Sequence, residues 1–182
     1  MKCAGDVTAA FPLFQADSGG SIPTSALQLH FYRTDRETFK ALNMRWHSVL
    51  PKIGGLFGRV YYAAEFDGHL YAVAMWSNPV ARLNPQITWL ELRRLAISDE
   101  APKNTASRML GWMARDIRKK FPLIVRLISY QDTSRHVGTI YKASGWVPNE
   151  TLTRRPRTWG QWRGGRTDQS VTARVRWELP IQ

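Results

Sequence analysis

The chain has 182 residues, of which 43% are apolar, and this length and composition are typical of one globular domain with a buried core. It carries 26 lysine and arginine residues against 14 aspartate and glutamate residues, a net charge of +12 that favours a polyanionic partner. No apolar run approaches the roughly 20 residues of a membrane span, and the start of the chain lacks the pattern of a secretory leader. The single cysteine, Cys3, excludes an intramolecular disulfide and a cysteine metal cluster, so we expect a protein of the reducing cytoplasm.

The predicted elements alternate between strands and helices along the chain. Leu27–Tyr32 alternates weakly as a first strand, and a capping box from Thr34 to Glu37 predicts a helix that ends near Trp46. Asp67-Gly68 between two β-rich runs predicts a hairpin. Hydrophobic periodicity and breaker residues predict the further strands Arg59–Glu65, His69–Met75, Thr88–Ile97, Leu123–Tyr130 and Val171–Leu179, and the helices Lys103–Lys120 and Val137–Ser144.

This order of elements predicts an α/β fold, in which helices flank a mixed β-sheet. We expect a single catalytic domain over residues 27–150, preceded by an irregular lead-in over residues 1–26 that is rich in glycine, serine and proline. Residues 151–182 form a basic extension that ends in a strand. The sequence therefore predicts one folded unit with charge concentrated towards its C-terminal end.

The C-terminal extension has seven arginines and three tryptophans but only two acids, Asp168 and Glu178. Arginine interleaved with tryptophan suits the phosphates and exposed bases of nucleic acid, whereas the alternative is a solvated tail. We therefore expect double-stranded DNA as a partner. The candidate DNA-binding residues are Arg154, Arg155, Arg157, Arg163 and Arg166.

Charged residues interrupt the otherwise apolar strand Thr88–Ile97. Burying a charge is costly unless it is paired or functional. Strand alternation puts Glu91 and Arg93 on one face and Arg94 on the other. A salt bridge between Glu91 and Arg93 explains one arginine but not both, so Arg94 is a candidate site residue.

The junction between this strand and the long helix can hold an anion. A helix N-terminus offers free N–H groups and a partial positive charge. Asn104 or Thr105 can cap the helix and Lys103 adds charge, although a plain capped helix is the alternative. The candidate donor-binding residues are Lys103, Asn104, Thr105 and Ser107.

Other polar residues stand at the ends of predicted elements. His47 is a candidate general base, since only histidine has an unperturbed pKa near neutrality, although a histidine at a helix end is often only a cap. Asp132 follows a strand end, where a carboxylate can reach a cleft, and Ser129 could orient a substrate. No metal ligand is predicted.

The segment Ser129–Trp146, SYQDTSRHVGTIYKASGW, resembles the last motif block of the GNAT acyltransferase superfamily. It is most similar to one branch, the phage Mom-type proteins that modify adenine in DNA. Three further segments resemble that branch: Trp46-His47-Ser48, Arg94-Leu95, and Pro102-Lys103-Asn104-Thr105 in place of a glycine-containing loop. The chain has no Gly-x-Gly-x-x-Gly, Walker or zinc deaminase motif, so an ordinary adenine methyltransferase and a zinc deaminase are disfavoured.

The resemblance implies a GNAT-like fold and the addition of a carbamoylmethyl-type, acyl-derived group to adenine N6, which protects phage DNA from restriction. It implies that Tyr141 protonates a leaving group and that Arg94 holds a phosphate or carboxylate; the alternative is that Tyr141 only packs in the core. The donor is open between acetyl-CoA and a glycine-derived activated unit, and a homodimer is compatible with the sequence. The alternatives are a conventional acetyl-CoA-dependent N-acetyltransferase and a non-catalytic DNA-binding protein.

Overall fold

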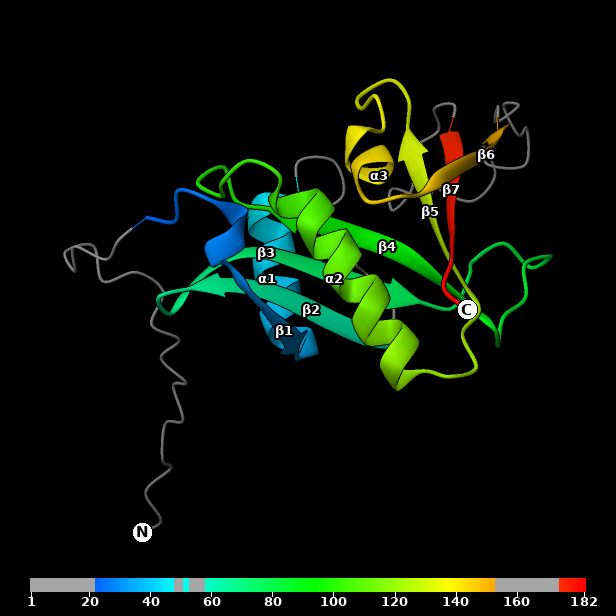
Figure 1. Ribbon diagram of the computed structural model, residues 1–182, viewed down its shortest axis with the longest axis horizontal. Coiled ribbons are helices and arrows are strands. Elements are labelled where there is room, and N and C mark those ends of the chain that lie inside the picture. Colours follow the sequence, from blue (N-terminus) through cyan, green and yellow to red (C-terminus); the bar gives the residue numbers. More distant parts are fainter. Residues whose placement is uncertain (1–21, 48–50, 53–57, 153–173) are drawn as a thin grey trace, which may run out of the picture.

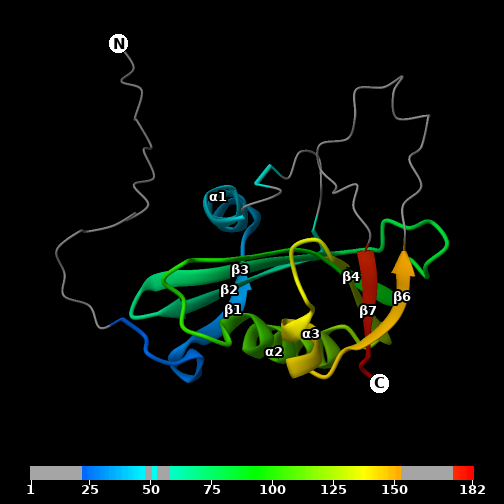
Figure 2. The ribbon, with the colours of Figure 1, turned by 90° about the horizontal axis from the view of Figure 1, so that it is seen from above.

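Seven strands form one mixed sheet in the computed structural model, which describes residues 22–47, 51–52, 58–152 and 174–182. Helix α1 lies on one face of the sheet, and α2 and α3 lie on the other (Figure 1, Figure 2). The predicted α/β class is confirmed. The elements are η1 (Ala26–Gln28), β1 (His30–Thr34), α1 (Arg36–Trp46), β2 (Val60–Phe66), β3 (His69–Ser77), β4 (Trp89–Ile97), α2 (Thr105–Lys120), β5 (Arg126–Asp132), α3 (Thr139–Ala143), β6 (Val147–Leu152) and β7 (Arg174–Pro180).

The strand order across the sheet is β1-β2-β3-β4-β5-β7-β6. All neighbours are antiparallel except β4 and β5, which run parallel. Their pairing ends at Leu92 opposite Ser129, although β4 continues to Ile97 and β5 to Asp132. The two central strands therefore separate towards their carboxyl ends and open the middle of the sheet.

A β-bulge in β4 lies next to this separation. Met75 on β3 pairs with Arg94, while the next residue, Trp76, pairs with Leu92, so Arg93 is the extra residue. Met75 faces the α1 side of the sheet and Trp76 the α2 side. Directly opposed residues share a face. Arg94 therefore lies on the α1 face with Glu91, and the predicted placement of Arg94 on the opposite face is wrong because the bulge breaks the alternation.

Each face of the sheet has its own core. The apolar stripe predicted for the long helix is buried in α2, where Met109, Leu110, Met113 and Ile117 pack against the sheet. On the opposite face, Phe39 of α1 packs in a smaller cluster. In the part of the chain that the structure describes, no helix is long and apolar enough to cross a membrane.

The ends of the first elements differ from the prediction. The first strand starts at His30, because Ser25 begins a capping box that folds Ala26–Gln28 into a short 3-10 helix. The N-cap of α1 is Asp35 and not Thr34, since the Asp35 carboxylate accepts a hydrogen bond from the Thr38 backbone N–H at 2.8 Å. The sequence thus located the first strand and helix but misplaced their starts.

The C-terminal part of the sheet contains a strand that sequence reasoning missed. Val147–Leu152 forms β6, although Pro148 and Asn149 disfavour a strand. The predicted last strand is present as Arg174–Pro180, and it lies between β5 and β6. Strand β7 therefore pairs with β5 on one side and with β6 on the other. The predicted helix Val137–Ser144 is shorter, at Thr139–Ala143.

Candidate active site

A cavity of about 580 Å³ lies where β4 and β5 separate. Its walls come from β4, the end of β5, the loop that leads into α3, and the end of α1, which meet there from distant parts of the sequence (Figure 2). All five candidate catalytic residues line this cavity: His47, Arg94, Ser129, Asp132 and Tyr141.

Tyr141 and Ser129 form a buried hydroxyl pair. The Tyr141 hydroxyl lies 2.8 Å from Ser129 Oγ, and either atom can donate. The tyrosine ring stacks on Trp177 with centroids 5.3 Å apart and meets Trp146 edge-on. Burial raises the pKa of Tyr141, and the Ser129 hydrogen bond offsets only part of that rise. Tyr141 therefore stays protonated and can donate a proton, while its ring also packs in the core.

His47 is the C-cap residue of α1, and its backbone N–H donates to the Asn43 carbonyl at 3.0 Å. His47 also lines the cavity, so the same residue caps α1 and belongs to the candidate site. Burial, followed by the positive charges of Arg94 and His136, lowers the pKa of His47 to about 4. The imidazole is neutral at pH 7 and can accept a proton, which it holds weakly.

The charges of β4 divide into two groups. Glu91 accepts a hydrogen bond from Arg93 at 2.7 Å and another from the Val80 backbone N–H at 2.8 Å. The predicted Glu91–Arg93 salt bridge is thus confirmed. Arg94 is 4% exposed and donates to the Arg93 carbonyl at 2.8 Å. Arg94 also lines the cavity, and after burial its charge is the next largest cause of the lowered pKa of His47.

Asp132 ends β5 at the cavity and also supports the following turn. One of its carboxylate oxygens accepts hydrogen bonds from the Ser134 backbone N–H at 3.0 Å and from Ser134 Oγ at 2.6 Å. These bonds fix the carboxylate at the strand end. Among the described residues, no group of three His, Cys, Asp or Glu side chains could hold a metal ion.

Sequence reasoning missed the residues that hold the loop before α3. The Gln131 side chain accepts a hydrogen bond from Trp177 Nε1 at 2.6 Å and donates to the His136 carbonyl. Gly138 has a φ of 77°, and a Cβ there would collide with the Trp177 ring and lie 2.7 Å from the Gln131 side-chain oxygen. No local pattern connects Gln131 with a tryptophan 46 residues later.

The segment proposed to bind the donor borders the cavity only through Ala106. Asn104, one of the two predicted caps, is the N-cap residue of α2, but it has a φ of 68° and its side chain makes no capping hydrogen bond. Its left-handed backbone instead supplies a conformation that favours glycine. Thr105 donates its hydroxyl hydrogen bond to the Pro102 carbonyl at 2.7 Å, Ser107 donates to the Asn104 carbonyl at 3.1 Å, and Lys103 is exposed.

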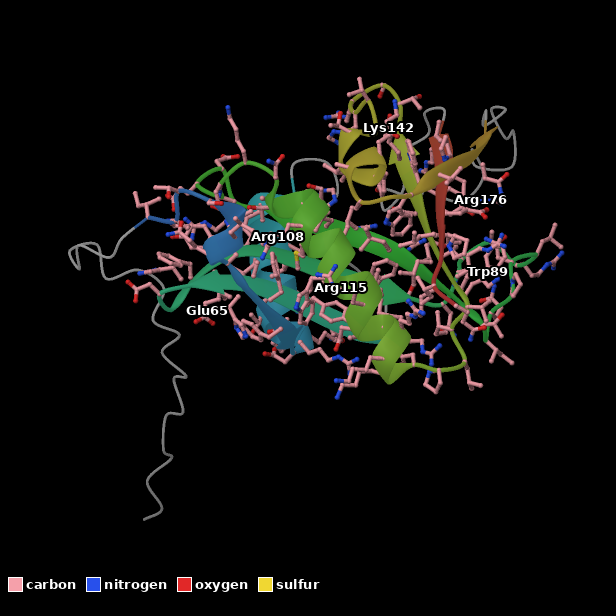
Figure 3. All side chains as sticks on the ribbon, viewed as in Figure 1. Glu65, Trp89, Arg108, Arg115, Lys142 and Arg176 are labelled. Atoms are coloured by element: carbon pink, nitrogen blue, oxygen red, sulfur yellow. The ribbon has the colours of Figure 1, made fainter. Side chains whose placement is uncertain are left out.

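The proposed DNA-binding arginines Arg154, Arg155, Arg157, Arg163 and Arg166 lie outside the described residues. Within the described part, the outer face of α2 is basic. Figure 3 shows Arg108 and Arg115 on this face, and Arg118 and Lys119 are exposed on the same helix. This face offers a second surface for a polyanion.

A profile of the Mom protein family matches residues 49–166, which is more than half of the chain. The chain belongs to the Mom protein family. The match includes β4, β5, α3 and therefore most of the walls of the cavity. No curated protein sequence matches this Mom-family chain.

Solved structures show that this Mom-family chain has the fold of GNAT acetyltransferases. An acetyltransferase from Salmonella typhimurium with acetyl-CoA superposes with a TM-score of 0.59 at 10% identity, over 85% of this chain and 95% of that one. A Bacillus subtilis acetyltransferase in complex with CoA gives 0.59 at 11%, over 85% and 99%. The Escherichia coli ribosomal-protein-S18-alanine N-acetyltransferase gives 0.55 at 13%, over 85% and 94%. Family and fold together support an acyl-transfer enzyme.

Proposed function

We propose that this protein transfers a carbamoylmethyl-type, acyl-derived group to N6 of adenine in DNA. The observation that carries the proposal is the cavity between β4 and β5, where a Mom-family chain brings together a neutral histidine, a buried arginine and a protonated tyrosine. A non-catalytic DNA-binding protein would not need such a set of groups gathered in one cavity. In a phage-infected cell, the modified DNA would resist restriction.

The reaction requires a base that takes a proton from the attacking amine and an acid that gives a proton to the leaving group. The lone pair of the adenine amine is delocalised into the ring, so N6 must lose a proton as it attacks the donor carbonyl carbon, and the bond from that carbon to the leaving group then breaks. This step joins N6 to a carbonyl carbon and gives an N6-glycyl group from a glycine-derived donor. The carbamoylmethyl group, in which N6 is joined to a methylene carbon, is its isomer and forms from it by rearrangement. His47 lines the cavity in its neutral form and takes this proton. Tyr141 gives a proton to the departing group and is supported by the Ser129 hydroxyl. Both groups then exchange protons with water, which restores the starting state.

Arg94 supplies fixed positive charge inside the cavity. An oxyanion forms on the donor carbonyl during the attack, and a buried arginine stabilises it more strongly than it would in water. Asp132, which lines the cavity at the end of β5, orients the adenine amine through a hydrogen bond. The adenine must leave the duplex stack to reach this site.

The test is mass spectrometry of nucleosides from the DNA of cells that express the chain. We expect a heavier deoxyadenosine, which is absent with the Tyr141→Phe variant. The mass also identifies the donor, since an acetyl group and a glycine-derived unit differ in composition. Carbamoylmethyl and glycyl adducts are isomers, so fragmentation must separate them.

A conventional acetyl-CoA-dependent N-acetyltransferase is the second candidate. The solved structures with acetyl-CoA and CoA favour it, because they share this fold. Unmodified DNA, together with acetylation of protein or small amines by the purified chain, would establish this alternative.

A further inference from the structure

The loop between β3 and β4, residues 78–88, projects from the end of the sheet where β4 begins (Figure 1). It exposes three apolar side chains: Leu83 is 94% exposed, Ile87 71% and Val80 46%. One exposed leucine needs no explanation. Three apolar side chains on one projecting loop call for a partner that covers them.

Internal hydrogen bonds fix the shape of this loop. The Asn84 backbone N–H donates to the Ala81 carbonyl at 2.9 Å. The Gln86 side chain donates to the Ala81 carbonyl at 3.1 Å and to the Asn84 carbonyl at 2.9 Å. Pro85 restricts the backbone beside these bonds. The tip therefore presents Leu83 in a preorganised conformation, which lowers the entropic cost of contact with a partner.

The same loop is fastened to both strands that flank the cavity. The Val80 backbone N–H donates to the buried Glu91 carboxylate at 2.8 Å, and Glu91 lines the cavity from β4. The Asn84 side chain donates to the Tyr130 hydroxyl at 3.2 Å, and Tyr130 lines the cavity from β5. The loop is therefore hydrogen-bonded to two residues of the cavity wall, one on each of these strands.

The positive charge of the loop favours a polyanionic partner. Arg82 is the single charged residue among residues 78–88, and it is exposed. Arg59 adds a second exposed cation at the base of the loop, where it donates to the Asn78 side chain at 3.3 Å. Glu91 adds no negative charge at the surface, because it is buried and paired with Arg93. An apolar tip with cationic flanks is complementary to stacked bases between phosphates.

We propose that the loop over residues 78–88 is a wedge that enters the base stack of duplex DNA beside the target adenine, with Leu83 between the bases and Arg82 at a phosphate. This inference rests on the proposed function, since a flipped adenine leaves a gap in the stack. Leucine and isoleucine side chains separate base steps in other DNA-bending and DNA-kinking proteins. The wedge holds the duplex open while the adenine occupies the cavity.

The experiment uses duplexes with one 2-aminopurine, an adenine analogue that fluoresces when it leaves the stack, flanked by randomised base pairs. A second set places the analogue opposite an abasic site, where leaving the stack costs less. The full-length chain is compared with Leu83→Ala and with the control Leu27→Ala, which truncates a leucine that is 70% exposed on η1, outside this loop.

We expect Leu83→Ala to lower the equilibrium constant for the unstacked base about tenfold in the paired duplex, a loss consistent with removal of one buried leucine side chain. The loss should be smaller opposite the abasic site, and Leu27→Ala should match the wild type. A general folding defect would affect both duplexes equally.

Two other results would overturn the wedge. If the wild type unstacks the analogue and Leu83→Ala does so equally well, the wedge fails and the adenine function stands. If the wild type leaves the analogue stacked in both duplexes, the wedge and the adenine function fail together. The alternative partner of the loop is a second copy of the chain, and sedimentation velocity tests it. If Leu83→Ala converts a dimer to a monomer and leaves the fluorescence unchanged, the loop is a contact between two copies of the chain.

Discussion

Replacing Tyr141 with phenylalanine removes one hydroxyl group from the cavity and leaves the ring that stacks on Trp177. That hydroxyl lies 2.8 Å from Ser129 Oγ, and both residues are buried. The variant leaves the Ser129 hydroxyl without this partner, which should lower the free energy of unfolding by about 1–2 kcal/mol. If the Tyr141 hydroxyl protonates the leaving group, the modification rate should fall by at least about 100-fold.

A double variant separates the structural effect from the chemical one. Ser129→Ala combined with Tyr141→Phe removes both ends of the hydrogen bond, so no buried hydroxyl is left and stability should recover towards the wild type. Activity should stay low, because the proton donor is still missing. Urea unfolding measures stability, and mass spectrometry of deoxyadenosine measures activity. A folded Tyr141→Phe variant with near wild-type activity, or activity that recovers together with stability in the double variant, would refute the reasoning.

Three further predictions concern the histidine, the tight turn and the extension. NMR of the imidazole should show that the pKa of His47, lowered to about 4 in the wild type, rises in Arg94→Gln, and a wild-type pKa near 6.5 would contradict this expectation. The unfolded chain takes up a proton that folded His47 does not, so the free energy of unfolding of the wild type should fall as pH drops from 6.5 towards 4. Gly138→Ala should lower the urea midpoint more than the control Gly68→Ala, since both have positive φ but only Gly138 lacks room for a Cβ; equal losses would show that the turn adapts. Replacing three arginines of the extension with alanine should flatten the slope of log affinity against log salt by roughly 2–3 units, measured by fluorescence anisotropy on a DNA duplex. The candidates are Arg154, Arg155, Arg157, Arg163 and Arg166. An unchanged slope would indicate that DNA binds instead to the basic face of α2.

Features that depend on near neighbours in the chain could be predicted from the sequence. The stripe of α2 follows from the spacing of apolar residues within a few turns, and the hairpin follows from Asp67-Gly68 between two strands. The Glu91–Arg93 salt bridge follows from two opposite charges two residues apart on one strand. These patterns placed the candidate residues at element ends, and the motif resemblance connected them to one site.

Features that depend on pairing between distant segments could not be predicted in this way. Nothing near Arg93 indicates a bulge, because the bulge is defined by the register against β3. Pro148 and Asn149 disfavour a strand, yet this segment pairs with β7 as β6, with a register shift between Pro148 and Glu150. The Gln131 side chain accepts a hydrogen bond from Trp177 of β7, so the loop before α3 is held by residues that become neighbours only after folding.

The cavity and its charge arise from one local change in the sheet. Pairing between β4 and β5 stops at Leu92, and the bulge follows at Arg93, the next residue. The bulge moves Arg94 onto the α1 face, where burial and then the charge of Arg94 lower the pKa of His47. A strand without the bulge would direct Arg94 towards the apolar core under α2, where an arginine would be costly. The charged run from Glu91 to Arg94 is therefore compatible with a central strand because the sheet opens there, and the same opening supplies the volume of the cavity that we propose for the donor and the adenine.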